Sequence, residues 1–336
     1  MHHVHSFTSR HTAMSFRRTL PVATLSLFAV AANAQTMVDA RTCDRAIGGS
    51  AIDRAAVARM VATSRTSPVG HFAAGCMHVM SAKWDSAAAQ FDAAAKGNPQ
   101  SSAAFLWVGN ITGQRARLTP DVQAKVRLAP QIRDAYAKAI ALDGTNIEAR
   151  EGLMQFLLEA PAPLGGDKAK AAEQAVAIGR VNPFRGLSAQ ISVAASQRDN
   201  IAVERFLTTA TTQFPDSVLG WANLSAMQAD AQRVTDAFAT VARWQARRTN
   251  AMFALFSFGR TSAVTGQQLD KGEQALKQYL RGQRGPNDPP FANAHYRLGQ
   301  IYERQKKKPE ARAEYQMALR NNPNLRDAQL SLDRVK

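Results

Sequence analysis

Two histidines and a cysteine lie within eight residues of one another and make the chain's best candidate for a metal site. They are His71, Cys76 and His78. Neutral imidazoles and a thiolate are ligands that zinc prefers. The same three residues are also compatible with ordinary helix packing, because Cys76 would point about 100° away from its neighbour Gly75 on a helix. The choice between the two depends on which elements carry these residues.

Two carboxylates form the second candidate for chemistry. Glu148 and Glu151 are three residues apart, so on a helix they share one face and could act as a glycosidase couple. Such spacing is more typical of a solvated helix face. Gly165 and Gly166 precede a helical segment, as in a phosphate-binding loop, but no Gly-Lys-Ser/Thr follows them. Since nucleophile-elbow and His-Glu-x-x-His motifs are also missing, we expect no enzyme, no catalytic residue, no metal and no cofactor.

The elements that must position these residues follow a spacing that occurs twice. A Gly, an Ala, an aromatic residue, an Ala and a Pro recur with identical gaps of 12, 4, 3 and 5 residues. The two sets are Gly75, Ala87, Phe91, Ala94 and Pro99, and Gly299, Ala311, Tyr315, Ala318 and Pro323. Small residues let two helices approach closely, and the aromatic ring fills the contact. The proline then ends the unit.

This pattern resembles the tetratricopeptide repeat, a helix-turn-helix unit of roughly 34 residues. The resemblance implies an all-α, right-handed superhelical solenoid of about seven hairpins over residues 68–325, with a capping helix at 326–336. A segment at 35–67 with one helix, near Ile52 to Ser64, precedes the array. His71, His78 and His295 occupy places where the family packs aromatic residues between helices. Packing is therefore the preferred interpretation of the histidines.

Two units depart from the family spacing. The second, about 102–146, reaches Tyr136 eleven residues late, and Asp121 is a good helix cap, so we expect a lengthened second helix. The third carries the insert from Ala160 to Gly166, in which two glycines can take positive φ. Asp167 should start the next helix. Residues 68–215 as a whole are similar to a group of exported bacterial repeat proteins with a prolyl, double-glycine insert.

The start of the chain has the features of an export signal. From Met14, two arginines precede an apolar run, and Ala32-Asn33-Ala34 is a typical cleavage site. We expect residues 1–34 to be leader and signal peptide, and the mature protein to be periplasmic or secreted. No later segment is long and apolar enough for a transmembrane helix. Whether Met1 or Met14 is the true start stays open.

The chain is strongly basic, with 42 Lys and Arg against 26 Asp and Glu. Three of the basic residues lie in the leader, so the mature chain carries 39 − 26 = +13. Export argues against nucleic acid as a partner. An anionic envelope surface could attract the basic C-terminal units, which include Lys306, Lys307 and Lys308. The alternative is that these charges only cover exposed helix faces.

Cys43 and Cys76 are the only cysteines, and an oxidising compartment would permit a disulfide between them. Such a bridge would pin the N-terminal segment across the first hairpin. The alternative is one buried and one unpaired thiol, and the sequence leaves both open.

Function should depend on the first helix of each hairpin, because first helices line the concave side of such arrays. We expect a protein or peptide to bind in this groove, and attachment to an anionic envelope surface is the alternative function. Phe72, Cys76 and Phe256 are expected to face the groove as apolar positions. The expected polar lining is Asn110, Gln114, Glu148, Glu151, Gln155, Glu159, Gln190, Arg198, Asp230, Arg260, Asn293, Tyr296, Gln300, Glu303 and Arg304.

Overall fold

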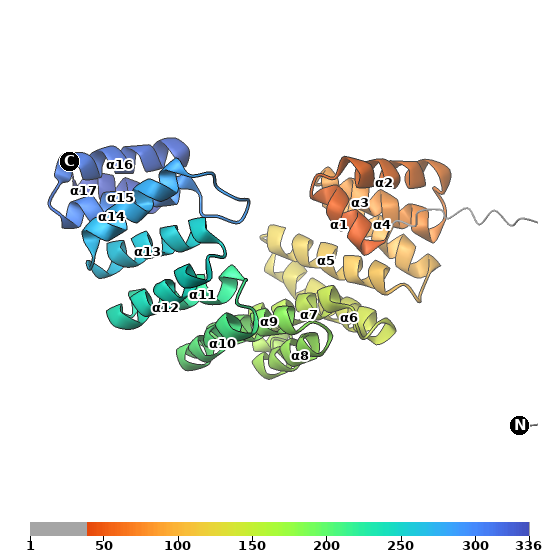
Figure 1. The fold of residues 1–336 in the computed structure, drawn as a ribbon. Coiled ribbons are helices and arrows are strands. Elements are labelled where there is room, and N and C mark those ends of the chain that lie inside the picture. Colours follow the sequence, from red (N-terminus) through yellow and green to blue (C-terminus); the bar gives the residue numbers. More distant parts are fainter. Residues whose placement is uncertain (1–38, 336) are drawn as a thin grey trace, which may run out of the picture. The chain divides into compact units, whose positions relative to one another are not determined.

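The computed structural model describes residues 39–335, and the predicted leader and cleavage site lie outside these residues. Within the described part the chain contains helices and no strands (Figure 1). The helices are α1 (Ala40–Ile47), α2 (Ala51–Thr63), α3 (Pro68–Met80), α4 (Trp84–Gly97), α5 (Ser102–Leu118), α6 (Val122–Leu142), α7 (Ile147–Glu159), α8 (Lys168–Val181), α9 (Pro183–Ser196), α10 (Asn200–Gln213), α11 (Val218–Asp230), α12 (Val234–Arg247), α13 (Ala251–Thr265), α14 (Leu269–Arg281), α15 (Phe291–Arg304), α16 (Lys308–Asn321) and α17 (Arg326–Arg334), with a short 3-10 helix, η1 (Ala162–Leu164).

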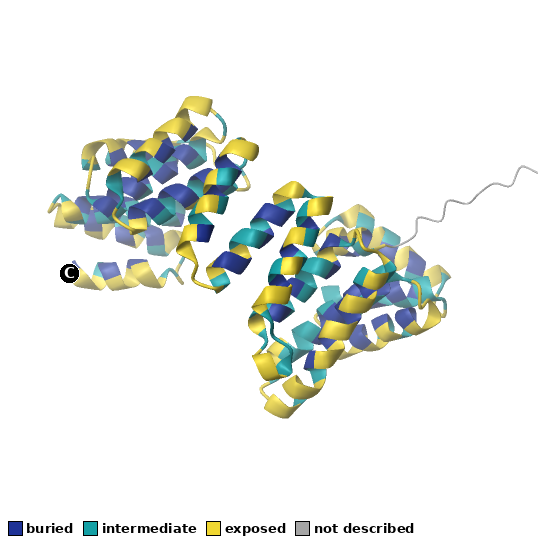
Figure 2. Ribbon diagram, turned by 90° about the horizontal axis from the view of Figure 1, so that it is seen from below, coloured by how far each residue is buried: buried dark blue, intermediate teal, exposed yellow. Residues whose placement is uncertain are grey.

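Helices α3 to α16 form seven hairpins, in which each helix packs on its partner and on the next hairpin. This confirms the predicted repeat array. Buried residues lie on the faces where helices meet, and exposed residues lie on the outer faces (Figure 2). Each hairpin therefore depends on its neighbours for much of its core, as expected for a repeat protein.

The spaced glycines lie at close helix crossings, as predicted. A Cβ atom on Gly75 would be 2.7 Å from the ring of Phe91, and one on Gly299 would be 2.6 Å from the ring of Tyr315. Such separations are shorter than carbon atoms tolerate, so a larger residue would force the helices apart. In the second hairpin Gly109 meets the ring of Tyr136 at 2.7 Å in the same way.

The second hairpin contains the lengthened helix that its spacing predicted. Helix α6 has 21 residues, and the carboxylate of Asp121 accepts a hydrogen bond from the Gln123 amide at 2.8 Å. Pro130 lies inside this helix. The residues that precede Pro130 extend the helix beyond the length of its partner, which is 17 residues.

The prolyl insert folds back on α7 and leads into α8. Gly165 has φ of +100°, as predicted, whereas Gly166 does not have positive φ. Gly166 is required for another reason, because a Cβ atom there would be 1.8 Å from the carbonyl oxygen of Ala160. The Asp167 amide donates to the carbonyl of Leu157 at 2.9 Å, and its carboxylate caps α8.

Additional helices close both ends of the array. Before it, the structure has two helices where the sequence predicted one, and Val57 and Met60 of α2 are buried against the first hairpin. After it, α17 packs on α16 and buries Ala328 and Ser331. Among the described helices none is long and apolar enough to cross a membrane.

Candidate functional site

The surface formed by α3, α5, α7, α9, α11, α13 and α15 is called the first-helix face below. Fourteen of the fifteen predicted polar lining residues lie on these helices. The exception is Arg198, which lies in the turn after α9 with φ of +58°. The turn separates it from the helix on which it was expected, because α9 ends at Ser196.

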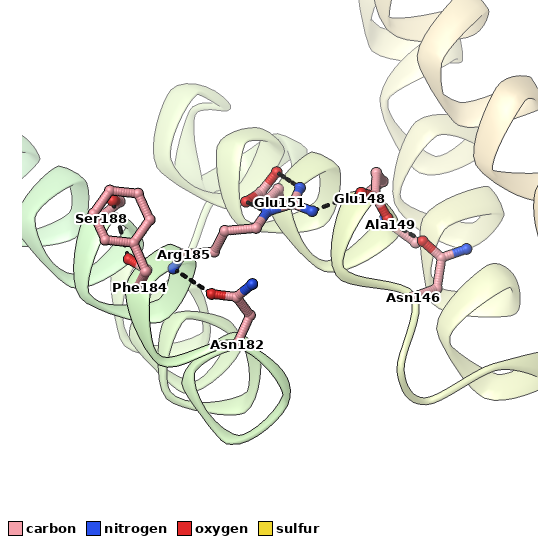
Figure 3. Close-up of polar contacts among 8 residues, drawn as sticks. All are labelled: Asn146, Glu148, Ala149, Glu151, Asn182, Phe184, Arg185 and Ser188. Atoms are coloured by element: carbon pink, nitrogen blue, oxygen red, sulfur yellow. Dashed lines mark hydrogen bonds and ion pairs between the residues drawn. The ribbon is translucent and has the colours of Figure 1, made fainter. Parts of the chain in front are cut away.

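The two carboxylates of α7 bind one arginine that sequence reasoning missed. Arg185, in the first turn of α9, contacts both oxygens of Glu151 at 2.9 and 2.6 Å, and Glu148 at 2.6 Å (Figure 3). Asparagine side chains cap the start of both helices: Asn146 accepts from Ala149, and Asn182 accepts from the backbone amide of Arg185. These caps fix the two first turns that carry the ionic groups.

This pairing removes the glycosidase interpretation of the two acids. Burial opposes ionisation of Glu148, but hydrogen bonds and charge from Arg185 outweigh it and hold the pKa of Glu148 below its usual range. The same contacts raise the pKa of Arg185. A general acid needs a raised pKa, so the cluster stabilises the contact between two hairpins and does not suit proton donation.

Other predicted lining residues also make contacts within the array. Asp230, the last residue of α11, pairs with Arg260 of α13 at 2.8 Å. Asn110 accepts a hydrogen bond from the Tyr136 hydroxyl at 2.9 Å. These contacts join neighbouring helices, so a large part of the predicted polar lining holds hairpins together.

The last hairpin shows the same behaviour. Glu303 accepts from Tyr315 at 2.7 Å and from Arg334 of α17 at 2.7 Å. Arg304 donates to two backbone carbonyls of α13, and Gln300 donates to the Tyr296 hydroxyl at 2.9 Å. Asn293 is half-buried on α15.

The apolar positions predicted to face the groove are covered. Phe256 is buried in the core of the sixth and seventh hairpins. Phe72 and Cys76 are buried because the short helix α1 lies against α3 and α5. Cys76 forms a disulfide with Cys43 of α1, with Cα atoms 5.6 Å apart. From the sequence, this disulfide and two free thiols were both possible, and Cys76 was expected to face the groove.

Two of the three predicted histidines, His71 and His295, contact the partner helix of their own hairpin through hydrogen bonds. His71 Nδ1 is 2.8 Å from the Gln90 side chain, and His295 Nδ1 is 2.6 Å from the Glu314 carboxylate. The two pairs occupy the same repeat positions in the first and seventh hairpins. Within the described residues no group of three or more His, Cys, Asp or Glu could hold a metal ion.

The two departures from the repeat spacing meet at one cavity, which we call the insert pocket. It has a volume of about 480 Å³ and lies between α5, α6, α7 and the insert. It is lined by Gly113, Ala116, Arg117, Lys125, Ala129, Ile132, Tyr136, Gly152, Gln155, Phe156, Glu159, Ala160, Pro161 and Leu164. This volume is within the range of small-molecule and side-chain binding sites, roughly 300 to 1,000 Å³.

Tyr136 lies at the base of the insert pocket. A Cβ atom on Gly109 of α5 or Gly152 of α7 would be less than 3 Å from its ring, so the ring lies between two neighbouring first helices. Burial raises the pKa of Tyr136 to about 12, and the hydroxyl stays protonated. The ring of Tyr136 therefore forms a fixed and uncharged inner wall of the pocket.

The charged groups around the insert pocket are less fully paired. Gln155 and Glu159, both predicted lining residues, bond to each other, and Arg117 donates to Gln114 at 3.1 Å. Lys125 makes no ion pair among residues 39–335. The chain next to these lining residues carries three exposed apolar side chains, Leu118, Val122 and Val126. The pocket can accept an apolar group with polar or charged neighbours.

Gln190 lines smaller cavities of about 370 and 310 Å³ between α8, α9 and α10. These cavities share Arg205 and Phe206, and the guanidinium of Arg205 is 5.0 Å from the centre of the Phe206 ring. They contain one predicted lining residue, compared with two in the insert pocket. A further cavity of about 550 Å³ at the last hairpin is lined by three, Gln300, Glu303 and Arg304.

Three consecutive lysines, Lys306, Lys307 and Lys308, connect α15 to α16. The first two lie in the turn, and Lys308 begins α16. Lys307 is 3.7 Å from the Glu273 carboxylate, and its ammonium lies 5.5 Å from the centre of the Tyr302 ring. Lys306 and Lys308 are exposed. One of the three cations is thus engaged within the array.

Comparisons with known proteins agree with this architecture. Residues 261–325 match the family model described as tetratricopeptide repeat. A tetratricopeptide repeat protein from Parabacteroides merdae ATCC 43184 aligns over 80% of this chain and 98% of its own, with 14% identity and a TM-score of 0.52. Two others align less closely. The Cut9-Hcn1 hetero-tetramer of APC/C gives 14% identity, coverage of 84% and 52%, and a TM-score of 0.44. YrrB is described as a repeat protein with an unusual peptide-binding site. It aligns with 15% identity over 72% of this chain and 96% of its own, with a TM-score of 0.30. No curated protein matches the sequence.

Proposed function

We propose, from the premise that this chain is a helical array with the tetratricopeptide repeat fold, that it is an exported scaffold without catalytic activity. It binds an extended segment of a protein or a peptide along the first-helix face, and one apolar side chain of that segment enters the insert pocket. Arrays of this kind are commonly interaction scaffolds, in which pockets select side chains along a bound segment.

The insert pocket is the observation that carries the proposal. Two sequence features, the lengthened α6 and the prolyl insert, depart from the repeat spacing and form its walls together. Neither is needed to complete a hairpin, and the adjoining apolar side chains of Leu118 and Val122 are 56% and 67% exposed. Exposed apolar surface beside a pocket is typical of an interaction site. Many of the polar residues elsewhere on the first-helix face bond to neighbouring helices, as Arg185 and Arg260 do.

Site-directed photo-cross-linking tests the proposal. A photoreactive amino acid in place of Glu159, at the edge of the pocket, should capture a discrete partner in cells that express the protein. The same amino acid in place of Glu173, exposed on α8, should not capture that partner. Mass spectrometry of the adduct identifies the cross-linked segment.

A pocket-filling variant provides the matched control. A Cβ atom on Gly113 has no neighbour within 4 Å, so Gly113→Phe can fill the pocket without a backbone clash. Gly144→Phe adds the same side chain in an exposed turn. The adduct should disappear in Gly113→Phe and persist in Gly144→Phe. An adduct that survives in Gly113→Phe would contradict binding through the pocket.

Export is part of the same proposal and has its own test. It is supported by the basic start, apolar run and Ala32-Asn33-Ala34 site, which lie outside the described residues. Mass spectrometry of the protein from an envelope extract should give an N-terminus at Gln35. An intact leader on a cytoplasmic protein would refute it.

A further inference from the structure

Helix α1 is attached to the array in an unusual way. It has eight residues, and its buried face consists of Thr42, Cys43 and Ala46. An isolated helix of this length is unstable in water, so its position depends on contacts with the rest of the chain. It contacts α3 and α5, the first helices of the first two hairpins, as well as α2.

The polar contacts of α1 do not hold it on the first-helix face. Within residues 39–335, its side-chain hydrogen bonds and ion pairs either stay in α1 or go to α2. Arg45 pairs with Asp53 at 2.8 Å, and Arg54 donates to the Ala46 carbonyl at 2.8 Å. The link from α1 to α3 is the disulfide.

The surface under α1 is apolar. Phe72 lies one turn before Cys76, so the two share a face of α3. The ring of Phe72 packs against Phe91 with centroids 5.3 Å apart, and Phe91 stacks on Trp107 of α5 at 5.1 Å. Phe105 of α5 packs against the same cluster and is half-buried. Removal of α1 would expose part of this cluster to solvent.

The charges on α1 fit this surface poorly. Burial and the nearby carboxylate of Glu148 raise the pKa of Asp44, so the docked helix holds two acids close together. Glu148 and Glu151 already share a single arginine. Arg41 of α1 adds some favourable charge near Glu148. A helix with a basic residue in place of Asp44 would complement the surface better than α1 does.

We infer that the surface of α3 and α5 under α1 is a second binding site, which accepts a short helix with small apolar residues and basic neighbours. The chain covers this site with its own α1, and the Cys43–Cys76 disulfide keeps the cover in place. Opening turns α1 away about Gly48 and Gly49, between α1 and α2, and breaks its ion pair from Arg45 to Asp53.

Opening of the site is a thiol–disulfide exchange. One thiolate of a dithiol reductant attacks a protein sulfur and forms a mixed disulfide, which releases the other cysteine as a thiolate. The second thiol of the reductant then attacks the mixed disulfide. The products are two protein thiols and the cyclic disulfide of the reductant, so two electrons pass from reductant to protein.

Hydrogen exchange on the full chain tests the cover. The oxidised protein is compared with the same protein in dithiothreitol and with Cys43→Ser. The amides of α1 should exchange at least about tenfold faster without the bond, while those of α7 to α16 stay unchanged. Equal protection of α1 in all three samples would overturn the inference, because the bond would not then hold the cover. The reduced wild type remains informative if Cys43→Ser fails to fold.

A peptide probe tests the site itself. The probe is a fluorescein-labelled synthetic peptide of residues 39–50 with Cys43→Ser, measured by fluorescence anisotropy. It should bind the reduced chain and the Cys43→Ser chain, and should not bind the oxidised chain. Adding Asp44→Lys to the peptide should tighten binding roughly threefold or more.

Two results of the peptide experiment would overturn the inference. Equal binding to oxidised and reduced protein would mean that the peptide uses another surface. No binding to any form would mean that the uncovered surface is not a binding site. Neither result tests the insert pocket, which is a separate site. Gly113→Phe, which fills the insert pocket, should leave binding of this peptide unchanged.

Discussion

The close approach of Gly75 to Phe91 makes Gly75→Ala a direct test of the packing. The added Cβ would lie 2.7, 2.8 and 2.9 Å from three carbons of the Phe91 ring. The ring cannot move easily, because it is fully buried between Phe72 and Trp107. Overpacking of this kind costs about 1 to 3 kcal/mol, whereas replacing a helical glycine by alanine returns about 1 kcal/mol. We expect a net loss of about 0 to 2 kcal/mol.

Gly113→Ala is the matched control for this change. Gly113 also lies inside a helix, α5, but a Cβ atom there meets nothing within 4 Å. The helix-propensity gain is then unopposed, and the protein should become more stable by about 0.5 to 1 kcal/mol. The same chemical change should thus have opposite signs at two positions.

Thermal unfolding followed by circular dichroism at the helical band measures both variants. A change of 1 kcal/mol corresponds to a shift of roughly 2 °C in a domain of this size, so the two variants should move in opposite directions. Phe91→Leu combined with Gly75→Ala should show a coupling of at least about 0.5 kcal/mol, since leucine removes the ring edge. A Gly75→Ala protein that gains as much stability as Gly113→Ala would refute the crossing geometry.

Three further predictions concern other contacts. Cys43→Ser should lower stability by at most about 3 to 4 kcal/mol, the constraint expected for a loop of 33 residues, as measured by urea unfolding. Arg185→Met should cost about 0.5 to 1 kcal/mol, because the ion pairs are partly exposed. Since the folded pKa of Glu148 is lowered, its contribution is present above its unfolded pKa and is lost as pH falls through the folded value. The decline in stability with acid, measured by unfolding at several pH values, should therefore be shallower in Arg185→Met. Gly166→Ala should displace the insert, with a loss of about 1 to 3 kcal/mol and faster hydrogen exchange at the start of α8.

Local spacing predicted the fold because the packing of each hairpin is itself local. The gap between Gly75 and Phe91 is set by the geometry of two adjacent helices, and the structure shows their contact. The extended length of α6 also followed from spacing, with Asp121 as its cap. Helix α1 was missed because it is short and interrupts no repeat. Its buried face consists of Thr42, Cys43 and Ala46, so no large apolar residue marked it as part of the core.

The binding face was predicted less completely, because helical periodicity gives the face of a residue and not its partner. Glu148 and Glu151 were placed on the correct helix, yet Arg185, which binds both, lies on the next hairpin and was not considered. Phe72 was assigned to an open groove because helix α1, which covers its face of α3, was not predicted. The insert pocket was not foreseen, since its walls come from two segments that the spacing treats as separate irregularities.

The helices at the two ends of the array limit how such a protein can change in length. Val57 of α2 and Ala328 of α17 are fully buried, so each end element is fitted to the hairpin beside it. A duplicated hairpin inserted between two interior hairpins would pack against neighbours similar to those of the original hairpin. One added beyond α17 would instead meet a mainly polar outer surface. Growth by gene duplication is therefore compatible with the middle of this chain and opposed at its ends.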